Sequence, residues 1–228
     1  MGGLIPGRPP PGLTGANSSL LSFRRWLPVD KQNYDKWKEV YRRGGEGPYP
    51  WDLGRPRDFL VDLVEKGMIG GRRALDTCCG LGTNGLYLAE MGFEVTGIDI
   101  SDQAVEIAGR RAKETGTAER TNFHASNFMD MDFAAGSFDF VLDVGCFHHV
   151  VPEDRLPFIE NIHRVLSPGG RYLLMCFSDR MGPSWNHFSE QQVRDFFSGH
   201  FKILILKEVS SVEGDGATRY FHIALMEK

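Results

Sequence analysis

Short apolar runs alternate with helical patterns from residue 71 to the end of the 228-residue chain. Strands are predicted over residues 74–77, 94–100, 121–125, 138–144, 171–177, 201–209 and 219–226. Helical spacing is clearest over 102–115, where Ser101 can cap the first turn and Gly116 can end the helix. Residues 167–170, Ser-Pro-Gly-Gly, predict a tight turn before the fifth strand. The alternation is typical of an α/β fold with a doubly wound, mostly parallel sheet.

The N-terminal part of the chain lacks this alternation. Residues 1–19 are rich in Gly, Pro and Ser and have few large apolar side chains, which is typical of a flexible tail. Residues 30–43 predict a helix with one aromatic face, and residues 59–64 predict a second amphipathic helix. We therefore expect a tail over 1–19, helices over 20–70 that form a lid, and one α/β domain over 71–228.

The composition restricts the partners of the chain. A formal net charge of -4 provides no positive field for nucleic acid or anionic lipid, and no apolar run is long enough to span a membrane. Cys78, Cys79, Cys146 and Cys176 do not follow a zinc-ligand spacing, so no metal site is predicted and the four are interpreted as reduced, buried thiols. We expect a cytoplasmic protein that acts on a small molecule, while the oligomeric state stays open.

A glycine-rich loop leaves the first predicted strand and enters a helix. Gly80, Gly82 and Gly85 have the spacing of a dinucleotide-binding loop, because glycine lets the backbone turn sharply and approach a ligand. Asp99 closes the next strand at the offset expected for an acid that binds ribose hydroxyls, and Ile100 follows it. The pattern predicts a nucleoside cofactor, but by itself it does not choose between a nicotinamide dinucleotide and S-adenosylmethionine.

The charge of Asp76 favours S-adenosylmethionine. This residue ends the strand just before the glycines, where its carboxylate is expected to face the ligand, and the loop contains no Lys or Arg. A carboxylate there repels a pyrophosphate and attracts the sulfonium and ammonium groups of S-adenosylmethionine. The alternative is that Asp76 only caps the following turn.

Four segments of the chain resemble, in order and spacing, the motifs of class I S-adenosylmethionine-dependent methyltransferases. They are residues 75–82, 97–99, 136–139 and 166–170. The resemblance implies a Rossmann-like, seven-stranded sheet with an antiparallel last strand, and S-adenosylmethionine as the cofactor. Cys78 stands where that family has its first loop glycine, and Asn127 stands where an aspartate is usual.

The loops after the third and fourth predicted strands supply further candidate residues. Asn127 and Phe128 are expected to contact the adenine, and Asp143 is expected to meet the methionine ammonium group. His148 and His149 then lie near the transferred methyl group, where one of them could accept a proton from the acceptor. The alternative is that one histidine packs against or caps the next helix.

Residues 34–37 and 50–56 resemble the lid segment of the thiopurine, halide/thiol and tellurite-resistance group of methyltransferases. This resemblance implies a lid that contains Trp37 and Trp51, an Arg219 that lies over the acceptor pocket, and a thiol or another soft chalcogen as the acceptor. The aromatic faces of Trp37 and Trp51 can cover the methionine end of the cofactor and attract its sulfonium; the alternative is that they pack into the core. Three alternatives stay open: O-, N- or C-methylation of a small metabolite, nicotinamide-dependent oxidation or reduction, and cofactor binding without catalysis.

Overall fold

Seven strands form one mixed sheet in the order β3-β2-β1-β4-β5-β7-β6. The computed structural model describes residues 31–228, so the predicted tail and the start of the predicted lid segment lie outside the described residues. The strands are β1 Arg73–Asp76, β2 Glu94–Asp99, β3 Thr121–Ala125, β4 Phe138–Val144, β5 Leu166–Phe177, β6 Lys202–Val212 and β7 Thr218–Glu227. The first five pair in parallel and β7 is antiparallel to both its neighbours, which confirms the predicted fold.

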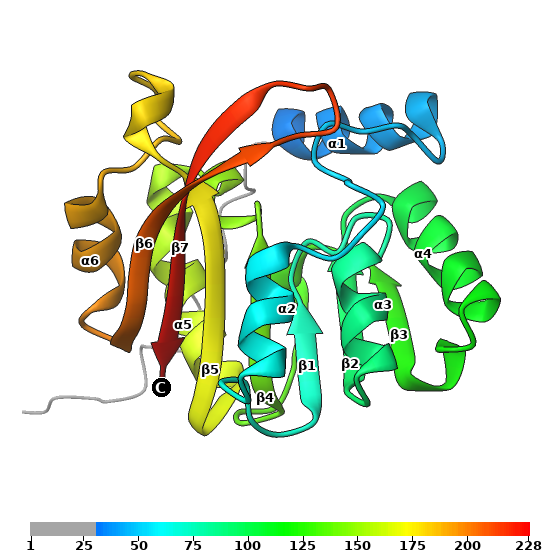
Figure 1. The fold of residues 1–228 in the computed structure, drawn as a ribbon, viewed down its shortest axis with the longest axis horizontal. Helices are drawn as coiled ribbons and strands as arrows, with labels where there is room; N and C mark the ends of the chain where they lie inside the picture. The colour runs from blue at the N-terminus through cyan, green and yellow to red at the C-terminus, as the bar shows by residue number, and fades with distance from the viewer. Residues whose placement is uncertain (1–30) are drawn as a thin grey trace, which may run out of the picture.

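Helices cover both faces of this sheet (Figure 1). They are α1 Lys31–Gly44, α2 Asp58–Glu65, α3 Thr83–Glu90, α4 Asp102–Glu114, α5 Arg155–Val165 and α6 Glu190–Phe197. Because side chains alternate along a strand, Phe140 and Leu142 of β4 pack in the core layer of α2 and α3, whereas Val141 packs in the layer of α5 and α6. The same alternation decides which way the polar side chains at the strand ends point.

Most predicted boundaries agree with the structure to within a few residues. The Ser101 side chain caps α4 by accepting a hydrogen bond from Ala104 N at 3.2 Å, as predicted. Residues 167–170, where a tight turn is predicted, lie within the bounds of β5 but bulge out of its pairing with β4, which shifts from Phe138 opposite Leu166 to Phe140 opposite Arg171. Beside this bulge, Gly169 N donates to Lys228 O, and Lys228 N donates to Gly170 O.

The hairpin formed by β6 and β7 extends beyond the edge of the sheet toward the segment that follows α1 (Figure 1). Gly214 N, in its tip, donates to Pro50 O at 2.8 Å. The hairpin thus connects the end of the chain with the lid segment near its beginning. Among residues 31–228, no helix combines the length and the apolar character that crossing a bilayer requires.

Candidate active site

A cavity of about 400 Å³ opens at the carboxyl edge of the parallel strands. Its floor consists of the loops that follow β1, β2, β3 and β4, at residues 77–81, 99–100, 126–129 and 144–150. Its roof consists of α1, residues 45–57 and the hairpin tip at residues 213–219. Ligands of open α/β sheets bind at this edge, so the predicted nucleotide loop and the predicted lid face each other across one cavity.

Gly80 lines the floor and has φ +52°, a conformation that side chains rarely adopt. Its N–H donates to Asp99 Oδ2 at 3.0 Å. A Cβ at this position would lie 2.9 Å from the Tyr41 hydroxyl oxygen in the roof. Glycine is therefore needed here both for the turn and for the close approach of floor and roof.

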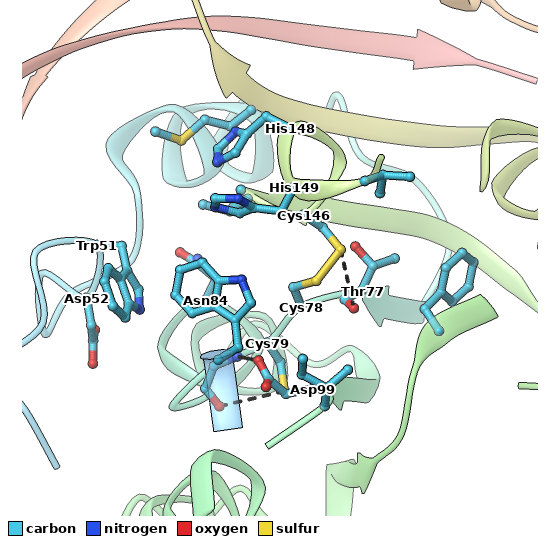
Figure 2. A pocket seen from close by; sticks show the side chains of 18 of the residues that line it. Trp51, Asp52, Thr77, Cys78, Cys79, Asn84, Asp99, Cys146, His148 and His149 are labelled. Carbon is cyan, nitrogen blue, oxygen red and sulfur yellow. Dashed lines mark hydrogen bonds between the residues drawn. A yellow bond between two sulfur atoms is a disulfide. The ribbon is translucent and has the colours of Figure 1, made fainter. Parts of the chain in front are cut away.

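Asp99 closes β2 and borders the cavity (Figure 2), as does Ile100, which follows it in the chain. Its Oδ1 accepts the N–H of Ser101 at 2.9 Å, and Oδ2 accepts Gly80 N–H. Burial raises the pKa of Asp99 to about 6, against the effect of these hydrogen bonds. Each carboxylate oxygen has a second acceptor position, so the side chain has capacity left for ligand hydroxyls.

The orientation predicted for Asp76 is wrong. This side chain does not line the cavity and is 2% exposed, and its Oδ2 has no hydrogen-bond partner. It points toward α3, because strand alternation places it on the same face as Ala74, and its Oδ2 lies 3.5 Å from where a Cβ of Gly85 would be. Burial, followed by the charges of Asp143 and Asp99, raises its pKa to about 8. The argument that its charge selects the cofactor therefore fails.

Gly82, predicted to contact the cofactor, is also placed differently in the structure. It has φ +82° but does not line the cavity. A Cβ there would lie 3.0 Å from Ala108 Cβ and 3.2 Å from the Phe123 ring. Gly82 lets the start of α3 pack closely against α4 and β3, so its role is packing rather than ligand contact.

Asp143 does not line the cavity either. It is fully buried on the face of α5 and α6, where its Oδ1 accepts Cys146 N at 2.8 Å and Phe147 N at 3.2 Å. The Tyr172 hydroxyl donates to its Oδ2 at 3.0 Å. Burial raises the pKa of Asp143 to about 6. Asp143 therefore fixes the loop after β4 through its hydrogen bonds.

The loop after β3 brings Asn127 and Phe128 to the cavity, as predicted. The Asn127 side chain also accepts Met129 N at 3.1 Å, which fixes the turn. Phe128 is 3% exposed and packs edge-on against Phe158, with ring centroids 5.3 Å apart. The two residues thus border the cavity, while their contact with the adenine stays a prediction.

Two of the cysteines form a disulfide, which corrects the prediction of four reduced, buried thiols. Cys78, which is exposed, and Cys146, which is 9% exposed, are bonded across a Cα–Cα distance of 5.5 Å (Figure 2). They are 68 residues apart in sequence and meet because β1 and β4 are neighbours in the sheet. Cys79 and Cys176 are buried and free.

The aromatic side chains of the roof contact one another and the floor. Trp37 meets Trp51 edge-on at 5.2 Å and His149 at 4.9 Å between ring centroids. Trp51 Nε1 donates to the Tyr41 hydroxyl at 3.1 Å, while 37% of Trp51 is exposed. Trp37 and Trp51 thus line the cavity from the side opposite the floor loops, and their role as a lid stays a prediction.

A buried ion pair holds the roof together, and sequence reasoning missed it. Arg57, in the roof, binds Glu213 in the hairpin tip through two hydrogen bonds of 2.8 and 2.9 Å, and it also donates to Trp51 O at 2.9 Å. The side chains of the pair are 7% and 2% exposed. Because 156 residues separate them, no local pattern could have connected them.

His148 and His149 both line the cavity but differ in their surroundings. His148 Nδ1 accepts Phe177 N at 3.3 Å, and its ring stacks on Phe177 at 4.0 Å. Burial holds the pKa of His148 well below its usual range and, with the charge of Lys36, lowers that of His149 to about 4. Both rings are therefore neutral at pH 7, and neither is a strong base.

Arg219 lines the cavity from β7, as expected for an acceptor-side residue. Its guanidinium forms a bidentate pair with Asp215, at 2.8 and 2.6 Å. Among the described residues that line the cavity, Arg57 and Arg219 are the arginines, and each is paired with a carboxylate. Neither is available to neutralise a diphosphate unless it gives up that partner.

These features fit S-adenosylmethionine. Asp99 presents acceptors for ribose hydroxyls, Gly80 leaves room for close backbone approach, and Phe128 supplies a flat apolar surface for a base. The tryptophans of the roof supply aromatic faces that attract a cation such as a sulfonium. The fit thus rests on Asp99, Gly80 and the roof rather than on Asp76.

Known methyltransferases are similar to this chain. Residues 74–170 match the family model of a methyltransferase domain. The chain is 31% identical over 183 residues to 2-heptyl-1-hydroxyquinolin-4(1H)-one methyltransferase of Mycobacteroides abscessus, which covers 74% of this chain and 77% of the relative. It is 30% identical over 164 residues to probable thiol methyltransferase 2 of Arabidopsis thaliana, which covers 72% and 70%.

The fold is shared with solved structures as well. One reported as "Conversion of a Disulfide Bond into a Thioacetal Group during Echinomycin Biosynthesis" superposes with a TM-score of 0.74 at 25% identity, over 86% of this chain and 92% of the other. The same fold occurs in solved methyltransferases, one of which has S-adenosylhomocysteine bound. The cavity described above therefore belongs to a fold that holds this nucleoside.

Proposed function

Because this chain belongs to the S-adenosylmethionine-dependent methyltransferases, we propose that it methylates a small thiol or another soft chalcogen acceptor. Family membership removes the nicotinamide-dependent alternative and the regulator without catalysis. Family membership does not identify the acceptor atom or the roles of individual residues, and these are what we propose.

The floor is the proposed binding site of the nucleoside. Asp99 would accept the ribose hydroxyls, Ile100 and Phe128 would enclose the adenine, and Asn127 would meet its polar edge. Gly80 and Cys78 border the space proposed for the methionine end, which Trp37 and Trp51 would cover from the roof. All of these residues line the cavity, whereas Asp76, Gly82 and Asp143 support it from behind.

The weak basicity of the two histidines is the observation that favours a soft acceptor. Burial keeps the pKa of His149 at about 4 and that of His148 lower than usual, and Phe177 N–H already occupies His148 Nδ1. A hydroxyl acceptor needs a good base, because its own pKa is high. A thiol has a pKa of about 8.5 and is partly ionised at neutral pH, so it can enter as the nucleophile without one.

The chain's own contribution to the reaction is then mainly positioning. S-adenosylmethionine supplies the electrophilic methyl group when it is bound. The floor and the roof hold the acceptor in line with that group and exclude water, an effect that can lower the barrier by ~7–11 kcal/mol. His149 and Arg219 would orient the acceptor at the end of the cavity opposite Asp99.

Two of the similar proteins support sulfur chemistry. One is named as a probable thiol methyltransferase, and the other structure concerns the conversion of a disulfide into a thioacetal. The hydroxyquinolinone methyltransferase supports a second candidate, an O- or N-methyltransferase of a small heteroaromatic metabolite. The aromatic roof would also suit such a ring.

An acceptor panel tests the proposal. Purified protein is given S-adenosylmethionine with a thiol, sulfide, selenite, halide, phenol, amine or hydroxyquinolinone, and release of S-adenosylhomocysteine is measured. We expect thiols or selenium compounds to give the highest kcat/KM. Turnover restricted to phenols, ring nitrogens or carbon acceptors would replace the soft-acceptor proposal with the second candidate.

The cytoplasmic location, the absence of nucleic-acid partners and the domain limits remain predictions.

A further inference from the structure

The disulfide of Cys78 and Cys146 lies in the wall of the cavity (Figure 2). Cys78 is exposed to the cavity, whereas Cys146 is 9% exposed. A small reagent that enters the cavity therefore reaches the sulfur of Cys78 first. The sulfur of Cys146 is then already within bonding reach of any group formed on Cys78.

The two loops that carry these cysteines are fixed without the disulfide. Cys79 N donates to Ile98 O at 2.9 Å, and Gly80 N donates to Asp99. On the other side, Asp143 accepts the N–H groups of Cys146 and Phe147. The positions of the two cysteines are thus set by main-chain hydrogen bonds, so the sulfurs stay adjacent in the oxidised and the reduced state.

The other two cysteines do not compete with this pair. Cys79 is buried, and burial, with the charges of Asp76 and Asp99, raises its pKa well above the usual range of a thiol. Cys176 is buried within the core under α5 and α6, and its pKa is raised as well. Since the thiolate is the reactive form, reaction with a small disulfide is confined to Cys78.

We propose that Cys78 is a thiol–disulfide exchange site for small disulfides that enter the cavity, and that Cys146 is its resolving cysteine. The inference uses the proposed placement of the cofactor next to Cys78. A mixed disulfide on Cys78 would project into the cavity and exclude the cofactor. Cys146 removes that adduct by forming the internal disulfide, whose two sulfurs remain in the wall.

The exchange balances with the small disulfide R–S–S–R as the oxidant. The Cys78 thiolate attacks one sulfur, the S–S bond of the reagent breaks, and one R–S⁻ leaves with Cys78 bonded to S–R. The Cys146 thiolate then attacks Cys78 Sγ, the bond to S–R breaks, and the second R–S⁻ leaves. The protein loses two electrons to the reagent, and the two cysteine protons end on the two R–SH molecules. Excess small thiol reverses both steps.

Intact-protein mass spectrometry tests the exchange. Protein is reduced with a phosphine, freed of the reductant and treated with 2-hydroxyethyl disulfide. We expect the wild type to form the internal disulfide with no adduct, Cys146→Ser to keep one adduct on Cys78, and Cys78→Ser to keep none. The control Cys176→Ala should behave as the wild type. If Cys146→Ser does not fold, Cys146→Ala takes its place.

Calorimetric titration with S-adenosylmethionine tests the consequence for the cofactor. We expect the adduct of Cys146→Ser to bind at least about tenfold more weakly than the same variant after phosphine reduction, while oxidised and reduced wild type differ little. An adduct that persists on the wild type, an adduct on Cys79 or Cys176, or an affinity unaffected by the adduct would overturn the proposal. None of these readouts measures methyl transfer, so failure of the soft-acceptor proposal leaves them unaffected.

Discussion

The floor and the roof of the cavity are built in different ways. In the floor, neighbouring strands place the loops, and main-chain groups hold them, as in the bonds of Gly80 N and Ser101 N to Asp99. In the roof, the hairpin tip near the end of the chain meets α1 and the segment 45–57 that directly follows it. One main-chain bond, from Gly214 N to Pro50 O, joins the tip to this segment, and the other contacts are between side chains, chiefly Arg57 with Glu213 and Trp51 with Tyr41.

This difference matches the two tasks proposed for the site, which are binding the cofactor and selecting the acceptor. In the proposed function, the floor binds the part of the cofactor that is the same for all acceptors, which requires a fixed backbone. The roof would meet the acceptor, and its contacts can change by substitution without disturbing the sheet. Substitutions in the roof should therefore affect stability of the lid and choice of acceptor, while those in the floor should affect cofactor binding.

The largest effect is expected for Arg57→Ala in the roof. The substitution leaves the Glu213 carboxylate buried without its partner, which should cost on the order of 3–5 kcal/mol of unfolding free energy in urea denaturation. The double variant Arg57→Met with Glu213→Leu removes both charges and should recover most of the loss. A loss below about 1 kcal/mol in the single variant, as for an exposed pair, would show that the roof does not depend on this contact.

The next largest effect is expected for Asp76→Asn beneath the floor. The pKa of Asp76 is about 8 in the folded protein and about 3.9 in an unfolded chain, so the folded state binds a proton that the unfolded state releases between these values. Stability should therefore fall as pH rises through this window. The asparagine variant stays neutral and should be more stable than the wild type near pH 8, by on the order of 2–4 kcal/mol.

Urea denaturation at about pH 5 and about pH 8 measures this effect. The advantage of the variant should be small at the lower pH and grow toward the higher one. If the wild type and the variant lose stability in parallel, the buried carboxyl is not the source of the pH dependence.

A smaller effect, confined to the floor, is expected from two matched glycine substitutions. Gly80→Ala places a methyl group toward the cavity and the Tyr41 hydroxyl, so it should weaken S-adenosylmethionine binding by about tenfold, with a strain of about 1–3 kcal/mol in the loop. Gly82→Ala meets Ala108 instead, so its main effect should be on the melting temperature. Calorimetry and thermal denaturation distinguish the two, and equal loss of affinity in both would contradict the assignment of Gly82 to packing.

The smallest effect is expected for His149→Gln at the acceptor end. With its pKa near 4, this histidine is a poor base, so the kcat for a thiol acceptor should change by less than about threefold, far below the 10²–10⁴-fold typical of lost general-base catalysis. The pH profile of kcat/KM should follow the ionisation of the thiol in both proteins. A hundredfold loss, or the disappearance of one limb of the profile, would show that His149 accepts the proton.

Sequence patterns were sufficient for the fold and for the core of the floor. Alternating strand and helix signals define the parallel sheet, and the glycine spacing with Asp99 marks the loop that lines the cavity. These features are local, since each depends on residues within one β-α unit. Trp37 and Trp51, which the resemblance to a known lid segment singled out, also line the cavity.

What the amino-acid sequence determined by itself was therefore the set of elements, their class of fold and the nucleoside loop. The tertiary structure alone decided that Asp76 and Asp143 point into the two core layers, that Cys78 meets Cys146, and that Arg57 pairs with Glu213. The physical reason is that a local pattern sets the periodicity of a strand or helix. Which core layer each face of a strand meets, and which distant loop lies beside the strand end, depend on the position of the strand in the sheet.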